Sequence, residues 1–105
     1  MYRKKNKMFD IIYFASFFNY MEKIKLPNRI NISNVMELKE LLIKEAESAD
    51  LLLDFSEVKE ADMAALQLIW VFKTQRSENE QETSIVDVNS EIKKSIRLLG
   101  FYNLL

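Results

Sequence analysis

Hydrophobic and polar residues alternate along residues 22–26, where Ile24 and Leu26 share one face. This period of two predicts a half-buried strand, and Pro27 ends it because proline has no N–H to donate to a neighbouring strand. Residues 29–32 repeat the alternation, which predicts a short second strand with Ile30 and Ile32 facing inward.

A helix is predicted over residues 34–48, because apolar residues recur there at the helical period: Val35, Leu38, Leu41, Leu42 and Ala46. Asn34 stands before this pattern, and Glu37 follows three residues later. The pair predicts a capping box at the start of the helix, in which each side chain binds a free backbone N–H.

The middle of the chain predicts a strand and then a helix. Residues 49–55 contain three consecutive leucines, an apolar run typical of a strand covered on both faces. Residues 63–72 are apolar except for Gln67, which predicts a helix over 63–74 that is buried or offers one face to a partner. Asp62 is placed to cap this helix. The polar stretch 73–82 is expected to leave the helix and form a loop.

A last strand and helix follow. Residues 83–88 predict the strand, and residues 91–99 predict the helix, with Asn89 or Ser90 as its cap. Gly100 stands where a helix commonly ends on a residue with left-handed backbone. The alternation of strands and helices predicts a single α/β domain with a largely parallel sheet.

Composition limits the chemistry of this chain. It has 105 residues, no His, no Cys, one Gly and one Pro. A Cys nucleophile, an imidazole base, a disulfide, a Cys/His zinc site and a glycine-rich phosphate loop are therefore excluded. Acidic groups such as Glu78, Glu80 and Glu82 lack partners at metal-ligand spacing and fit solvated charge better. We expect a binding or regulatory module with no enzyme activity, metal or cofactor.

Residues 1–20 differ from the rest of the chain. They carry four basic residues, one acidic residue and seven of the twelve aromatic residues. Three interpretations stay open: a signal peptide, an interfacial anchor or docking helix, and an upstream extension with Met21 as the working start. Residues 21–105 have a net charge of −4, which does not predict binding to nucleic acid.

Three stretches of residues 22–105 resemble the STAS domain, the fold of bacterial anti-sigma factor antagonists. They are the strand and loop of residues 52–58, the Asp-led helix start of residues 61–69, and the C-terminal part from Val86 to Asn103. The sequence of residues 64–68 is most similar to that of small stand-alone members, such as the STAS subunit of the phospholipid-transport ABC system and chemotaxis-associated proteins. The resemblance implies a mixed, largely parallel four-stranded sheet with three or more helices packed mainly on one face.

The same resemblance implies a partner-binding surface at the start of helix 63–74: Asp62, Met63, Ala64 and Ala65, with Ser33 and Asn34 from the neighbouring loop. In the family, a Ser or Thr after the motif Asp is phosphorylated to switch binding off. Here Met63 and Ala64 carry no hydroxyl, so this switch is not expected. Ser56 is the candidate replacement phosphosite, although a Ser after a strand is more often a turn former.

The resemblance implies a protein partner: a kinase-type anti-sigma protein, an ABC ATPase or a chemotaxis component. The cytoplasm is the expected location, membrane contact is expected only if residues 1–20 form an anchor, and a homodimer is a further arrangement to test. The alternative functions are a small-ligand or nucleotide-binding module, or the STAS subunit of an ABC lipid-transport complex. Trp70 is expected in the core, with an interface anchor as its alternative. Lys93, Lys94 and Arg97 are expected on a solvated face, with an acidic partner or phosphate as the alternative.

Overall fold

The computed structural model of the protein describes residues 22–105, so the predictions for residues 1–20 and for a start at Met21 lie outside the described residues. The elements follow the order β1 (Glu22–Lys25), β2 (Arg29–Ile30), the 3-10 helix η1 (Ile32–Asn34), α2 (Val35–Lys44), β3 (Asp50–Asp54), β4 (Glu60–Ala61), α3 (Met63–Glu78), β5 (Glu82–Val86), α4 (Ser90–Leu98) and the 3-10 helix η2 (Tyr102–Leu104).

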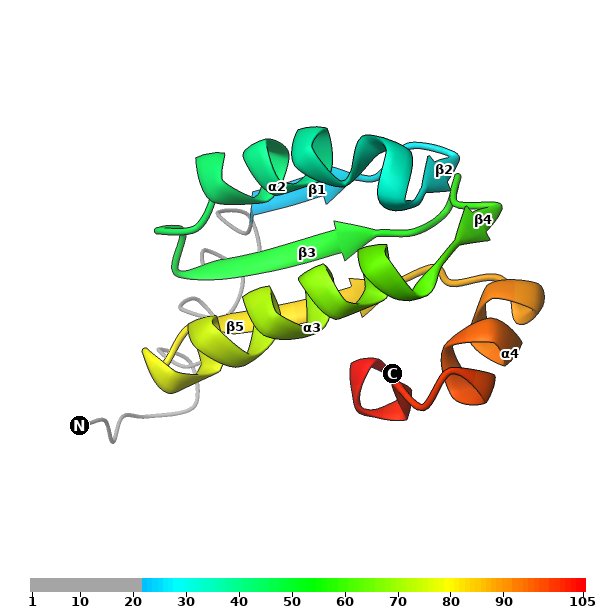
Figure 1. Ribbon diagram of the computed structural model, residues 1–105. Coiled ribbons are helices and arrows are strands. Elements are labelled where there is room, and N and C mark those ends of the chain that lie inside the picture. The colour runs from blue at the N-terminus through cyan, green and yellow to red at the C-terminus, as the bar shows by residue number, and fades with distance from the viewer. Residues whose placement is uncertain (1–21) are drawn as a thin grey trace.

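The strands form two parallel sheets (Figure 1). The larger sheet has the order β1-β3-β5, with Ile24 opposite Leu53 and Leu53 opposite Ile85. The smaller sheet pairs β2 with β4, placing Ile30 opposite Ala61. The predicted α/β class and parallel pairing are confirmed, but a three-stranded and a two-stranded sheet replace the single four-stranded one. The sequence did not predict β4, because a two-residue strand exists only through its pairing with β2.

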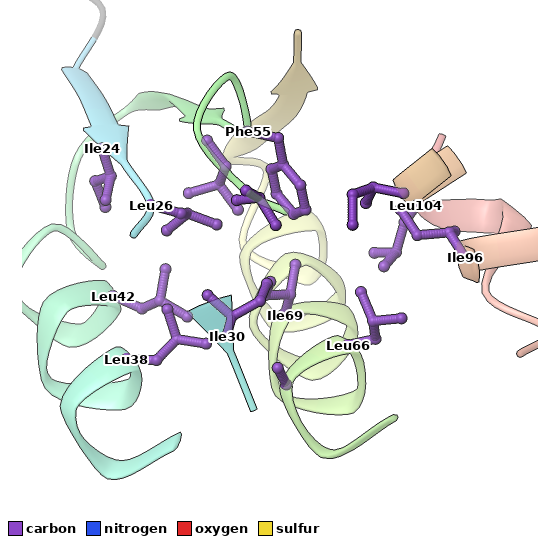
Figure 2. Packing of buried hydrophobic residues seen from close by; sticks show 14 of the residues in the cluster. Ile24, Leu26, Ile30, Leu38, Leu42, Phe55, Leu66, Ile69, Ile96 and Leu104 are labelled. Atoms are coloured by element: carbon purple, nitrogen blue, oxygen red, sulfur yellow. The ribbon is translucent and has the colours of Figure 1, made fainter. Parts of the chain in front are cut away.

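Helices α2 and α3 cover the same face of the larger sheet (Figure 2). Right-handed crossovers from β1 to β3 and from β3 to β5 place both helices on one side. The apolar core lies between these layers and includes Ile24, Leu53, Leu42 and Ile69. Leu52 points to the other face of β3 and is only half-buried, so the prediction that this strand is covered on both faces is wrong in that respect.

Helix α3 extends to Glu78, so the predicted end of this helix at residue 74 is wrong, and most of the polar stretch 73–82 is helical. Arg76 explains the extension, since this polar side chain lies on the inner face of α3 and is buried. Asn79 is the C-cap of α3, and Glu80 after it has a φ of 61°, the left-handed conformation that a glycine would usually adopt there. Helix α4 ends as predicted on Gly100, with a φ of 85°.

Two further predictions are wrong. Ile32 was expected in a strand and facing inward, yet it begins η1 and is 67% exposed. Trp70 was expected in the core, yet it is exposed on α3. Both errors arise because the local pattern shows that a residue is apolar but not whether another element covers it.

Candidate functional site

The start of α3 is joined to the loop before α2 by one side chain, Asp62. One oxygen of its carboxylate accepts a hydrogen bond from the N–H of Ala65 at 3.0 Å, which caps α3 as predicted. The other oxygen accepts from the N–H of Ile32 at 2.9 Å, which holds the first residue of η1. The carboxylate therefore fixes the position of η1 relative to α3.

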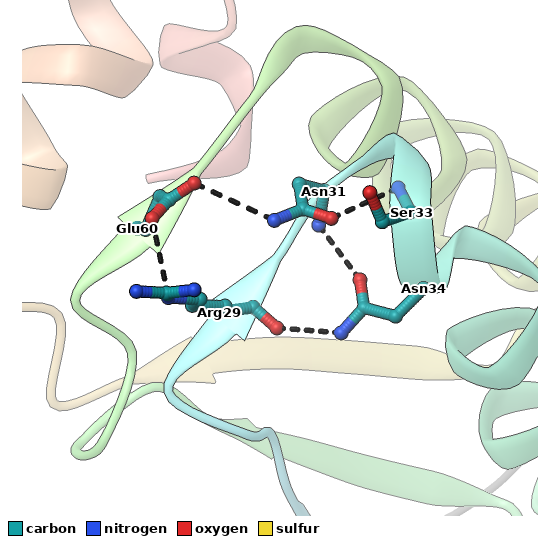
Figure 3. Close-up of polar contacts among 5 residues, drawn as sticks. All are labelled: Arg29, Asn31, Ser33, Asn34 and Glu60. Carbon is teal, nitrogen blue, oxygen red and sulfur yellow. Dashed lines mark hydrogen bonds and ion pairs between the residues drawn. The ribbon is translucent and has the colours of Figure 1, made fainter.

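The loop that carries η1 is ordered by a network of amide side chains (Figure 3). Asn31 caps η1 by accepting from the N–H of Ser33 at 2.9 Å. Asn34 accepts from the N–H of Asn31 at 2.8 Å and donates to the carbonyl of Arg29 at 2.7 Å. Asn34 thus closes a capping box with Asn31. The predicted box of Asn34 with Glu37 is wrong, because Asn34 makes no side-chain cap to α2.

An ion pair connects this loop to β4. The side chain of Arg29 lies 3.4 Å from a carboxylate oxygen of Glu60, and the amide of Asn31 donates to the second oxygen at 3.4 Å (Figure 3). Together, these hydrogen bonds and this ion pair position the backbone between β2 and α2. Ser33 contributes its backbone N–H to the network, and its side chain is exposed.

The four expected contact residues at the start of α3 differ in accessibility. Met63 is 47% exposed, and Asp62 and Ala64 are half-buried. Ala65 is fully buried in the core, so the expectation that it contacts a partner is corrected. Ala65 faces the sheet because it lies two residues after Met63 on a helix, where such residues do not share a face.

Ile32 and Met36 add two apolar side chains to this region. They are 67% and 64% exposed, and η1 places Ile32 against Asp62, the residue before Met63. We call Ile32, Met36 and Met63 the Met63 face. The sequence analysis missed Met36, although a methionine among the polar residues of an amphipathic helix is a signal that could have identified it.

The exposed apolar surface continues along α3. Trp70 and Val71 are exposed, and with Gln67 they line one side of a cavity of about 420 Å³. Gly100, Phe101 and Asn103 line its other side. The sequence predicted that α3 is buried or offers one face to a partner. The structure shows one face of α3 buried in the core and one apolar face exposed.

Ser56 lies in the turn that follows β3. Its N–H donates to the carboxylate of Asp54 at 2.8 Å. This hydrogen bond is the main reason that the pKa of Asp54 lies below its ordinary value, and the Ser56 hydroxyl, Lys23 and Lys25 act in the same direction. Ser56 is exposed, and the turn explains its presence.

The sequence also contains acidic clusters and three basic residues on α4. Within residues 22–105, no group of three or more acidic side chains is arranged to hold a metal ion. Lys93, Lys94 and Arg97 are exposed on α4, as expected.

A family profile described as "Mlab, STAS domain" matches residues 21–105. The match covers most of the chain, and the protein therefore belongs to the STAS domain family. A comparison with curated protein sequences finds no match.

Two solved structures show the same fold. One is a murine anion transporter, member A9 of solute carrier family 26, in the inward-facing state: the TM-score is 0.68 at 13% identity, over 80% of this chain and 14% of that one. The other is a sulfate transporter family protein from Wolinella succinogenes: the TM-score is 0.65 at 17% identity, over 81% of this chain and 71% of that one. This chain therefore spans only a small part of the murine transporter. None of the helices within residues 22–105 has the length and hydrophobicity needed to cross a membrane.

Proposed function

We propose that the protein is a non-catalytic STAS module that binds a protein partner through the Met63 face. The observation that carries the proposal is the exposure of Ile32 and Met63 at the turn held by Asp62, with Met36 exposed on the first turn of α2. Exposed methionines suit a contact surface, since the thioether is flexible and polarisable. Aromatic residues and methionine are also enriched in interfaces, which extends the proposed surface toward Trp70.

Binding at this face is proposed to be independent of phosphorylation at the usual family position. Met63 and Ala64 occupy the first turn of α3 and have no hydroxyl group. We therefore expect binding at this face to be constitutive or to be regulated by another input. Ser33 is the exposed hydroxyl of this region.

The partner classes that we propose are an ABC ATPase, a kinase-type anti-sigma protein and a chemotaxis component, with the domain acting in the cytoplasm. Among them an ABC ATPase is favoured, because the family profile bears the name Mlab and both structural neighbours are transport proteins. The protein would then be the STAS subunit of a lipid-transport complex.

The test is affinity purification of the full chain from its native cells with three variants. Met63→Glu places a charge in the apolar face and is expected to reduce partner recovery at least about tenfold, as for an interface hot spot. Met63→Leu keeps an apolar side chain and is expected to retain the partner. Leu105→Glu, after η2, is the matched control, because Leu105 is also apolar and is exposed to a similar extent, 45%.

The proposal is contradicted if Met63→Glu and wild type recover the same partner in equal amounts. Circular dichroism on each variant checks that the fold is retained, which the exposure of Met63 leads us to expect.

A small-ligand site is the second candidate, favoured by the cavity of about 420 Å³ beside Trp70 and Phe101. Its volume and aromatic lining are typical of ligand pockets. Calorimetric titration with fatty acids and nucleotides tests it, and no heat with any of them would remove this candidate.

A further inference from the structure

The two ends of the described chain differ in charge. Six acidic residues lie where α2 and α3 finish and where β3 and β5 begin (Figure 1): Glu45, Glu47, Asp50, Glu78, Glu80 and Glu82. Helix α4 lies toward the opposite end and carries three basic residues and one acidic residue, Glu91. The neighbouring loops and β4 also hold Glu57, Glu60 and Asp87, so the basic residues are concentrated on α4 itself. Residues 22–105 hold eleven basic and fifteen acidic residues, so α4 opposes the overall sign of the chain.

The basic residues of α4 are accessible. Lys93, Lys94 and Arg97 are all exposed, and the three ion pairs recorded within residues 22–105 involve other lysines and arginines. Lys93 and Arg97 are four residues apart, and Lys94 and Arg97 are three apart, so neighbouring turns of the helix present them together. Their positive charge is directed to solvent.

Two large apolar side chains accompany this charge. Leu98 is 80% exposed, more than any other large apolar residue described, and Tyr102 on η2 is 63% exposed. Leu98 lies one turn after Lys94 on the same face. The buried residues Ile92 and Ile96 already fix α4 to the core, so the exposure of Leu98 is not required for packing.

We propose that this surface, formed by Lys93, Lys94, Arg97, Leu98 and Tyr102 and called the α4 surface, docks on a bilayer of anionic lipids. The lysines and the arginine match lipid phosphates, a leucine reaches the acyl boundary, and a tyrosine suits the depth of the headgroups. The acidic end then points away from the negatively charged bilayer.

The exposure of Leu98 favours a bilayer over an acidic protein. Leu98 projects into solvent, and a protein partner would need a matching apolar hollow surrounded by carboxylates. A bilayer supplies phosphates and an apolar interior next to each other at any point of its surface.

The test is co-sedimentation of the full chain with vesicles of phosphatidylcholine alone and of phosphatidylcholine mixed with phosphatidylglycerol. Wild type is expected to bind only the mixed vesicles, and raised salt is expected to weaken the binding. Lys94→Gln with Arg97→Gln is expected to weaken it about 25-fold, because each basic residue near an anionic surface contributes about fivefold. Leu98→Ser, added to these two substitutions, is expected to weaken vesicle binding further.

The matched control is Lys39→Gln with Lys44→Gln, which removes the same charge from exposed positions on α2. Because residues 1–20 are unchanged in every protein, any difference between the two double variants comes from the α4 surface. Equal binding by both double variants would overturn the proposal. Wild-type binding that does not depend on phosphatidylglycerol would also overturn it. The absence of any vesicle binding would overturn it too, and would point to an acidic protein as the partner.

Discussion

At the residue scale, Asp54 and Asp62 show how similar carboxylates perform different tasks. Asp54 ends β3, accepts from the N–H of Ser56 at 2.8 Å and lies 3.6 Å from the ammonium of Lys23. Asp62 follows β4 and accepts from two N–H groups of different elements. Asp54 therefore stabilises a local turn, whereas Asp62 joins two distant segments.

We predict that Asp54 makes the stability of the protein depend on pH in the acidic range. Its folded pKa lies below the ordinary value, mainly because of the hydrogen bond from the Ser56 N–H. The unfolded chain therefore binds the proton more readily, and the stabilisation, present above an ordinary pKa of about 4, is lost as the pH falls through the folded pKa. Asp54→Asn should flatten this decline.

Urea unfolding at neutral pH and at a pH of about 3 measures the effect. Glu40→Gln, which alters an exposed carboxylate on α2, is the control and should keep the wild-type decline. If both variants decline equally, the hydrogen bond of Asp54 does not determine the acid sensitivity.

At the element scale, the caps at the starts of the helices show which contacts are local. Asp62 caps α3 and Asn89 caps α4 within three residues, so residue type and position predicted Asp62 and left Asn89 or Ser90 for α4. The cap at α2 differs, because η1 precedes it and Asn31 takes the role expected of Asn34. The hydrogen bonds of Asn34 to Arg29 and Asn31 outcompete a cap to α2.

We predict that Asp62→Ala lowers the free energy of unfolding by about 2 kcal/mol. About 1 kcal/mol comes from the lost cap of α3, and a similar amount comes from the lost hydrogen bond between the N–H of Ile32 and the carboxylate. Asp62→Asn should cost about half as much, because its single amide oxygen can replace one of the two contacts.

Chemical denaturation at neutral pH checks this order. A loss below about 0.5 kcal/mol for Asp62→Ala would contradict the role of Asp62 in joining η1 to α3.

At the scale of the whole molecule, Arg76 ties three segments together. Its guanidinium donates to the Thr83 hydroxyl at 2.6 Å, to the carbonyl of Ala46 at 2.7 Å and to the carbonyl of Glu82 at 2.8 Å. It also lies 5.7 Å from the centre of the Phe72 ring. Burial lowers its pKa, partly offset by the charge of Asp50. The end of α3, the loop before β3 and the start of β5 therefore share one anchor.

We predict that Arg76→Lys lowers the free energy of unfolding by about 2 kcal/mol and Arg76→Met by about 3 kcal/mol. A lysine has one compact ammonium and cannot reach several acceptors, and a methionine leaves all of them unpaired. Arg97→Lys on exposed α4 is the control and should change stability by less than about 0.5 kcal/mol. Equal stability of the Arg76 and Arg97 variants in urea would contradict the anchor.

The candidate site was predictable in part. The sequence located Asp62 as a cap and Met63 as an exposed residue, because both depend on their place at a helix start. It could not locate Ile32, since the alternation of residues 29–32 ends when β2 stops after Ile30. Only the pairing of β2 with β4 decides where that strand stops.

Local periods and caps determined the order of the three α-helices and of strands β1, β2, β3 and β5, since these signals act between residues a few positions apart in the chain. The tertiary structure decided which apolar residues stay exposed, how the strands divide into two sheets, and that Arg76 is buried. These features depend on contacts between residues about 30 positions apart, such as Ile32 with Asp62 and Ala46 with Arg76. No local pattern encodes such a contact, because each partner has the same local signal whether or not the other is near.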